Sequence, residues 1–369
     1  VDHIKKQKAK VINPSWLVLM HENWKQVFER EIDGYARVDA NKESGEIFIV
    51  GKDELTIFST NKSNVEQINY KNTPRFFDVN YRVFYNPNDN KIYSYTVDGL
   101  PYYKLNIISG EWNSSGFPVN YQTHFRHHNG YFNSSKNEFY TFAGYGGHRY
   151  RNAVYKFSLN DSTIDNQPVD NAVFSPRYLA GLAELNDTVY ILGGYGSTSG
   201  NQLINPQSYF NLIGYDIEKS EFFEKFKIPT LLDDMVVANN FWINKNTRDF
   251  YALIFSKIKF ENNLQLIKGS LDSPEVELVG EKIPFQFHDT RSFATLYYMP
   301  EQNKLYTYVS FFNDNISQVK IFEINHPPNM SVSSLETNKK SDGLLLILLL
   351  FIAGLIVLTI SLVLLLKKR

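Results

Sequence analysis

The sequence predicts an all-β fold, a six-bladed β-propeller built from four-stranded sheets, followed by a single C-terminal transmembrane helix. Two observations lead to this prediction. A strand-and-turn unit recurs six times along the 369 residues, and the stretch from Gly343 to Leu366 contains no charged residue. Short strands of alternating polarity, separated by polar turns at this repeat length, are typical of the blades of a propeller.

Each repeat is marked by a polar turn and a short apolar strand with an aromatic residue at its third position. The spacings between these aromatic residues are 45, 47, 50, 61 and 55 residues, and the six are Phe48, Tyr93, Tyr140, Tyr190, Tyr251 and Tyr306. A further strand precedes each aromatic strand and an amphipathic strand follows it, and the length of the repeat points to blades of four strands. The repeats place the propeller at residues 34–325.

The segments around the propeller have separate predicted roles. Residues 1–33 are expected to supply a strand that closes the ring, with Ser15 to Leu19 as the closing strand and Trp24 to Phe28 opening the first blade. Residues 326–342 are polar and rich in Ser and Asn, which predicts a stalk. Because the chain starts with Val, we also expect that a leader precedes it.

The uncharged stretch at residues 343–366 is long enough, at roughly 36 Å as a helix, to cross a bilayer core of about 30 Å. It ends at the basic residues 367–369, and basic residues favour the cytoplasmic side. We therefore expect a single-pass protein of the cell membrane with its propeller on the extracytoplasmic side, which is the periplasm in a bacterium. The absence of Cys is compatible with an oxidising compartment.

One repeat resembles a known family. Thr188 to Tyr195, with the sequence TVYILGGY, resembles the core of a kelch repeat, and Phe139 to Gly147 is a looser copy. Pro176-Arg177 and Pro74-Arg75 also look like kelch. The resemblance implies a kelch propeller similar to the central domain of galactose oxidase, in which Gly146, Gly147, Gly193 and Gly194 let the backbone turn sharply. A pair of β-sandwiches is the alternative fold.

Several kinds of chemistry are disfavoured by the composition. Without Cys, the chain lacks the Cys–Tyr cross-link of a galactose-oxidase copper site, and no repeated turns of the sialidase type occur. His124, Arg126 and His128 share one face of a strand and His127 the other, so at most two histidines converge. The net charge of −1 and the lack of a basic stripe argue against nucleic-acid binding. We expect no metal, no cofactor and no catalytic residues.

The kelch resemblance implies a binding site at the mouth of the ring, lined by the starts of the strands that precede the aromatic anchors. Mixed charges and aromatic groups there suit a polar ligand or a peptide loop. The residues at these positions are Arg75, Asp78, Arg126, His127, Arg177, Tyr178, Asp233, Asp234, Asp289 and Arg291.

The expected function is ligand or partner binding by a membrane-anchored propeller. The chain resembles the ectodomain of bacterial single-pass sensors, which implies the input part of a signalling receptor whose cytoplasmic output domain is absent from this chain. A surface-anchored adhesion or scaffold module is an alternative, and an anchored carbohydrate-acting enzyme is a third. The ligand is unknown, and a homodimer is compatible with the sequence.

Overall fold

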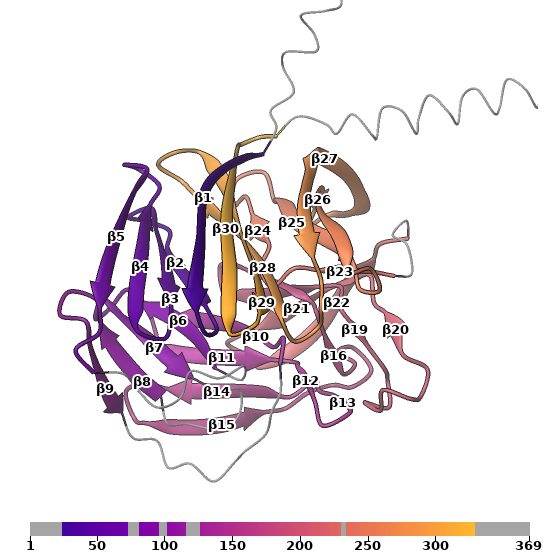
Figure 1. Cartoon of the computed structure of the whole chain (residues 1–369). Coiled ribbons are helices and arrows are strands. Elements are labelled where there is room, and N and C mark those ends of the chain that lie inside the picture. The colour runs from indigo at the N-terminus through magenta and orange to yellow at the C-terminus, as the bar shows by residue number, and fades with distance from the viewer. Residues whose placement is uncertain (1–23, 73–80, 96–101, 116–125, 230–233, 329–369) are drawn as a thin grey trace, which may run out of the picture.

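The computed structural model describes residues 24–72, 81–95, 102–115, 126–229 and 234–328. Within these ranges the chain is all-β, and its strands pair in antiparallel sheets (Figure 1). Six sheets of four or more strands follow one another along the chain, with two smaller sheets between them. This arrangement is compatible with a β-propeller.

The predicted fold class needs one correction. It combined a propeller with a transmembrane helix at 343–366, whereas the described ranges contain strands, bends and turns and no helix. No helix among the described residues is long and apolar enough to cross a bilayer. Residues 343–366 lie outside the described residues, as do Ser15 to Leu19, the stalk segment 329–342 and the basic end 367–369.

The first three sheets follow the repeats in order. The first sheet contains β2 (Arg37–Asn41), β3 (Glu46–Val50), β4 (Glu54–Ser59) and β5 (Asn64–Asn69). The second contains β6 (Arg82–Asn86), β7 (Lys91–Tyr95), β8 (Tyr102–Asn106) and β9 (Glu111–Ser115). The third contains β10 (Asn129–Asn133), β11 (Glu138–Phe142), β14 (Val154–Ser158) and β15 (Thr163–Gln167).

The other three sheets complete the series, and the longest strands lie in the fifth and sixth. The fourth contains β17 (Gly181–Leu185), β18 (Thr188–Leu192), β21 (Asn211–Asp216) and β22 (Glu221–Lys227). The fifth contains β23 (Met235–Val237), β24 (Trp242–Ile243), β25 (Asp249–Ser256), β26 (Glu261–Ser270) and β27 (Ser273–Gln286). The sixth contains β28 (Ser292–Met299), β29 (Lys304–Asn313), β30 (Ile316–Asn325) and β1 (Lys25–Asp33).

Two small sheets accompany the third and fourth sheets: one lies in the loop after β11, and the other joins the segment before β17 to the loop after β18. One pairs β12 (Tyr145–Gly146) with β13 (Arg149–Tyr150). The other joins β16 (Arg177–Tyr178), β19 (Tyr195–Gly196) and β20 (Gln207–Ser208). Both sit where the first strands of the third and fourth sheets begin, and they extend that side of the molecule.

The two ends of the described chain meet in the sixth sheet. β1 pairs antiparallel with β30, with Glu29 opposite Lys320 and a bulge between Gln26 and Phe28. Along the chain, the first strands of successive sheets also contact one another: β2 with β6, β6 with β10, β10 with β17, β17 with β24 and β24 with β28. The first strands therefore line the inside of the molecule, and their starts lie near each other.

Six hydrophobic clusters hold these sheets together, and each cluster is shared by two consecutive sheets. Phe48 of β3 packs against Tyr85 of β6, with ring centroids 5.0 Å apart, and Phe84 stacks on Phe139 of the third sheet at 4.1 Å. The cluster between the sixth and first sheets includes Phe28 of β1 and Phe58 of β4. Since burial of apolar surface contributes about 25 cal/mol per Å², these shared clusters are the main source of cohesion between sheets.

The turns that join the first and second strands of the sheets have a common conformation. The residue at or next to the start of each second strand has a positive φ, between 51° and 69° in Gly45, Asn90, Asn137, Asn186, Arg248 and Asn303. Gly and Asn adopt this left-handed region at low cost. Asn side chains also cap these turns: the Oδ1 of Asn41 accepts from the backbone N of Ser44 at 3.2 Å. This explains why so many Asn residues separate the strands.

A buried amide connects three sheets close to the inner strands. Asn129 at the start of β10 is fully buried, and its Nδ2 donates to the carbonyl oxygens of Ala180 (2.8 Å) and Asn239 (2.7 Å). The backbone N of Asn239 in turn donates to the carbonyl of Ala294 at 3.0 Å. One side chain thus connects the third, fourth and fifth sheets, and the backbone continues to the sixth.

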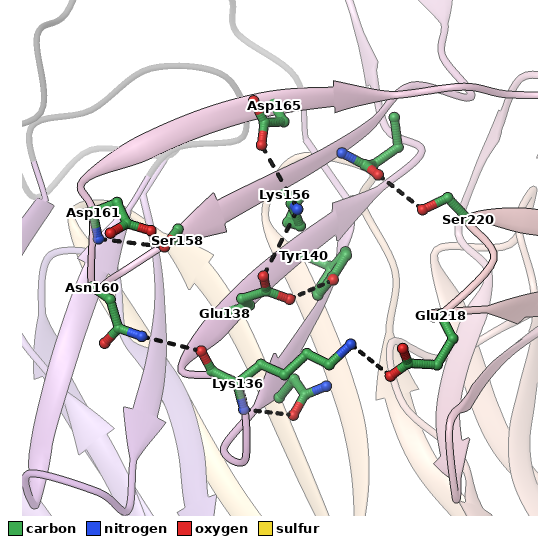
Figure 2. A network of polar contacts seen from close by, with 12 residues as sticks. Lys136, Glu138, Tyr140, Lys156, Ser158, Asn160, Asp161, Asp165, Glu218 and Ser220 are labelled. Carbon is green, nitrogen blue, oxygen red and sulfur yellow. Dashed lines mark hydrogen bonds and ion pairs between the residues drawn. The ribbon is translucent and has the colours of Figure 1, made fainter.

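At the outer edge, a polar network joins the third and fourth sheets (Figure 2). Lys136 Nζ lies 2.6 Å from Glu218 Oε1, and Ser220 Oγ donates to Gln167 Oε1 at 3.1 Å. Within the third sheet, Lys156 lies between Glu138 and Asp165 at 3.8 and 3.7 Å. Exposed pairs of this kind contribute roughly 0–1 kcal/mol each, so the network adds little beside the apolar clusters.

We predict that Asn129→Ala lowers the free energy of unfolding by about 2–3 kcal/mol, because the buried carbonyl of Ala180 loses the amide donor and that of Asn239 keeps only the backbone N of Leu182. Urea unfolding of the full chain measures the change. Asn160→Ala, in the exposed network of Figure 2, is the matched control and should change stability by less than about 0.5 kcal/mol. Equal effects of the two substitutions would contradict a structural role for Asn129.

Asp39 on β2 yields a pH-dependent prediction. Burial raises the pKa of this carboxyl from its usual 3.8 to about 6, opposed by the backbone N of Tyr85, which donates to Oδ2 at 2.7 Å. The folded state therefore holds a proton that the unfolded state releases, so this group makes stability fall as pH rises from about 4 to about 6. Asp39→Asn keeps the acceptor and should remove that fall, leaving the variant more stable at pH 7.5, by on the order of 2 kcal/mol. Thermal unfolding at pH 4.5 and 7.5 compares the two proteins, and a variant less stable at both pH values would refute this.

Candidate ligand-binding site

The starts of the first strands enclose a basic pocket, which we call the arginine pocket. Four arginines line it, and they come from the first, second, third and sixth sheets or from the segments just before their first strands. Its lining residues are Tyr35, Ala36, Arg37, Arg82, Arg126, His127, Thr290, Arg291, Ser292, Phe293, Ser310, Phe312 and Ser317. No acidic side chain is among these described lining residues.

Arg126 and Arg82 form the inner wall of the pocket. The backbone of Arg126 is fixed by a two-way bridge with Tyr145, at 2.7 and 3.0 Å, while its side-chain Nε is buried without a hydrogen-bond partner. Arg82 lies over the ring of Phe293, with its guanidinium carbon 4.7 Å from the ring centroid. Burial lowers the pKa of Arg82, and the nearby Arg126 lowers it further.

Arg37 and Arg291 complete the basic lining in different ways. Arg37 is buried; its Nε donates to the carbonyl of Tyr81, its Nη1 donates to the carbonyl of Ala36 at 3.0 Å, and it lies over the ring of Tyr35. Arg291 is exposed at the rim, where its Nη1 donates to Asn313 Oδ1 at 3.1 Å. Arg37 is therefore held by the fold, whereas Arg291 can move toward a ligand.

His127 lies between the arginine pocket and its neighbours. Its backbone is left-handed, with φ of 51°, and its Nε2 bonds the carbonyl oxygen of Asp289 and lies 3.7 Å from Asp289 Oδ1. Burial lowers the pKa of His127, Arg82 and Arg126 act in the same direction, and Asp289 opposes them. The imidazole is therefore neutral at pH 7, and we assign its Nε2–H as the donor to the Asp289 carbonyl.

On the other side of His127 is a group of four aromatic residues, which we call the tyrosine cluster: Tyr145, Tyr150, Tyr178 and Tyr195. The ring of Tyr178 lies 5.9 Å from His127 and 5.0 Å from Tyr145. Burial raises the pKa of Tyr178, and Asp289 raises it further, so the phenol stays protonated. Lys257 lies over the Tyr195 ring at 4.3 Å. Tyr150 and Tyr178 are buried, whereas Tyr145 and Tyr195 are partly exposed and offer flat surfaces next to the basic pocket.

A second, largely apolar pocket adjoins the arginine pocket and shares His127, Ser292 and Phe293 with it. Its other lining residues are Leu179, Ala180, Val237, Ala238, Asn239, Phe255, Phe285, Phe287 and Ala294. Together the two pockets combine convergent polar groups with apolar walls, the usual composition of a ligand site.

The residues predicted for the mouth fall into three groups. Arg126, His127 and Arg291 line the arginine pocket, and Asp289 and Tyr178 contact His127. Two others lie elsewhere: Asp234 accepts from Ser256 Oγ at 2.6 Å at the edge of the fifth sheet, and Arg177 is buried away from the pocket. Arg75, Asp78 and Asp233 lie outside the described residues.

Arg177 supports the backbone of the best kelch-like repeat. Its Nη1 donates to the carbonyl of Gly193 (2.9 Å) and to Asn211 Oδ1 (2.8 Å), and its guanidinium lies over the Tyr209 ring. Burial lowers the pKa of Arg177 to about 10, which leaves it charged at neutral pH. Gly193 and Gly194 have φ of 69° and 113°, and a Cβ on Gly193 would lie 2.8 Å from Val237. Here the glycines let the turn pack against the fifth sheet.

In the preceding repeat the same conformation falls on different residues from those predicted. Ala143 and Gly144 have φ of 65° and 120°, close to the values at Gly193 and Gly194. Gly146 lies in β12, and Gly147 has φ of 54° with open space around it. The Gly-Gly pair predicted the turn at Gly146-Gly147, whereas the backbone places it three residues earlier.

Arg37 and Arg82 were not predicted from the sequence. Both begin the first strand of their sheet, one position that all repeats share, so an alignment of the strand starts could have identified them. The two neighbouring histidines have different partners. The ring of His128 bonds the Tyr95 hydroxyl at 3.2 Å, whereas that of His127 bonds the carbonyl of Asp289. The part of the chain that the structure describes contains no group of three or more metal-ligating side chains.

No protein-family model matches this sequence, and a search of curated proteins finds no relative.

We predict that Arg177→Lys lowers the free energy of unfolding by about 3–4 kcal/mol, because the ammonium cannot reach the Gly193 carbonyl and Asn211 together while buried. Denaturant unfolding measures the loss. Arg248→Lys, whose guanidinium pairs with Asp272 at the surface, serves as the control and should cost less than about 1 kcal/mol. A variant as stable as the parent would argue against Arg177 as a structural residue.

Proposed function

We propose that the chain is a six-bladed, kelch-like β-propeller whose mouth binds a polar ligand or a polar loop of a partner protein. The six sheets, the clusters between consecutive sheets and the pairing of β1 with β30 support the propeller. The paired left-handed residues at Gly193-Gly194 and Ala143-Gly144 support the kelch-like character in two repeats.

The arginine pocket carries the binding proposal. It brings four guanidinium groups together at the convergence of four sheets, next to the tyrosine cluster and the apolar pocket. Arginine and tyrosine are the residue types that most often anchor ligands and partners, because they combine hydrogen bonding with large flat surfaces.

Binding fits the described part of the site better than catalysis. His127 uses its Nε2 on a backbone carbonyl, and the side chains that line the arginine pocket include no nucleophile held against a general base. As the input part of a receptor, the mouth would take a small ligand. As an adhesion or scaffold module, the alternative function, it would take a segment of another protein.

We predict that Thr290→Trp abolishes ligand binding, because Thr290 lines the arginine pocket and an indole would fill it whatever the charge of the ligand. The full chain is first screened against sets of metabolites, glycans and peptides by thermal shift, and the hits are measured by calorimetry. Thr247→Trp is the control, in the exposed turn that leads into β25 at the other end of the strands. Hits that bind the Thr290 variant with unchanged affinity would place the binding site elsewhere.

A further inference from the structure

The proposed mouth has a specific chemical requirement, and this inference rests on the proposed function. We propose that the ligand carries an anionic group, a carboxylate or a phosphate, and that Arg82, Arg126 and Arg291 hold this group in the arginine pocket.

The first reason is the balance of charge. Three arginines besides Arg37 line one small pocket, and its described lining contains no acid. Asp289 lies next to the pocket but faces His127, and Asp39 accepts from the backbone of Tyr85. Arg82 and Arg126 are partly buried, and charges withdrawn from water are normally paired, so a cluster of cations without acids calls for an anion from outside.

The second reason is the state of the individual guanidiniums. Among the described residues, Arg82, Arg126 and Arg291 form no ion pair; their contacts are an aromatic ring, a backbone bridge and the neutral amide of Asn313. The Nε of Arg126 is buried and has no acceptor at all. A buried donor left unsatisfied costs about 1–3 kcal/mol, which an incoming oxyanion would recover.

Other arginines of this chain show what a structural role looks like. Arg30 pairs with Glu54 at 2.8 Å, and Arg248 donates to both carboxylate oxygens of Asp272, from Nε at 2.7 Å and from Nη2 at 3.0 Å. Arg177, although deeply buried, donates to three acceptors, Ser175, Gly193 and Asn211. Arg82, Arg126 and Arg291 differ from these because none of the three is paired with a carboxylate among the described residues, which is what a site prepared for an anion requires.

The guanidinium group also suits the proposed ligand. Its planar fork matches two oxygens of a carboxylate or phosphate, and such charge-assisted pairs are about twice as strong as neutral hydrogen bonds. Arg82 lies over the ring of Phe293 and forms no ion pair among the described residues, so its N–H groups can pair with an oxyanion. The partial burial of Arg82 strengthens the attraction further.

The test is titration of the full chain with inorganic phosphate and, separately, with acetate, at constant ionic strength set by chloride. We expect at least one anion to raise the melting temperature saturably, and calorimetry to give a stoichiometry near one. A response to phosphate alone assigns a phosphate group to the ligand, and a response to acetate alone assigns a carboxylate. Stabilisation by neither anion overturns the inference.

Arg126→Met is the decisive variant. It should weaken anion binding at least tenfold, yet without anion it should melt at or above the temperature of the parent, because it removes a partly buried charge that has no ion-pair partner. Arg248→Met is the control, since it removes the same charge outside the pocket, and it should leave anion binding unchanged. Equal anion affinity in the parent and Arg126→Met proteins overturns the inference.

The two proposals fail differently. If Thr290→Trp abolishes binding of a screened ligand while Arg126→Met leaves it intact, the mouth binds ligands but does not select an anion. If neither substitution affects the ligand, the mouth is not the binding site, and both proposals fall.

Discussion

The packing of each sheet against its two neighbours is the constraint on which the rest of the structure depends. Six apolar clusters lie between consecutive sheets, and the pairing of β1 with β30 places the first described strand of the chain in the sixth sheet, against the first sheet. No sheet could bury both faces alone, so the sheets must succeed one another around a common interior. It follows that the first strands converge, and that short segments preceding them are brought together from distant parts of the sequence.

The features that depend on local conformation could be predicted from the sequence. Asn and Gly before the second strands mark left-handed turns, and the aromatic residue at the third position of each of these strands is buried in the structure. Both follow from short-range rules, the cost of a positive φ and the alternation of a strand. The described residues are all-β and contain no helix, and the segment 343–366 for which a helix was predicted lies outside them.

The site could be predicted only in part, because its residues are defined by long-range packing. Arg126 and Arg177 look alike in sequence, each beside an aromatic residue near the start of a repeat. Arg177 is buried, and its guanidinium donates to the carbonyl of Gly193. Arg126 lines a pocket, and its Nε has no hydrogen-bond partner. Likewise, the Gly-Gly pair predicted the turn at Gly146-Gly147, although Ala143-Gly144 makes it. Neither difference is encoded within a window of a few residues.

The contrast between Arg126 and Arg177 also says how the fold can sustain the pocket. A protein whose free energy of unfolding exceeds the minimum needed for function by a few kcal/mol tolerates unsatisfied buried groups, provided that the surroundings hold them in place. Here the backbone of Arg126 is fixed by Tyr145, and the nearby Asn129 joins three sheets beneath it. The rigid interior therefore keeps mutually repelling cations close together, at a cost that the apolar clusters offset. An anion that entered would remove that cost, so the same feature that weakens the empty protein would strengthen its complex.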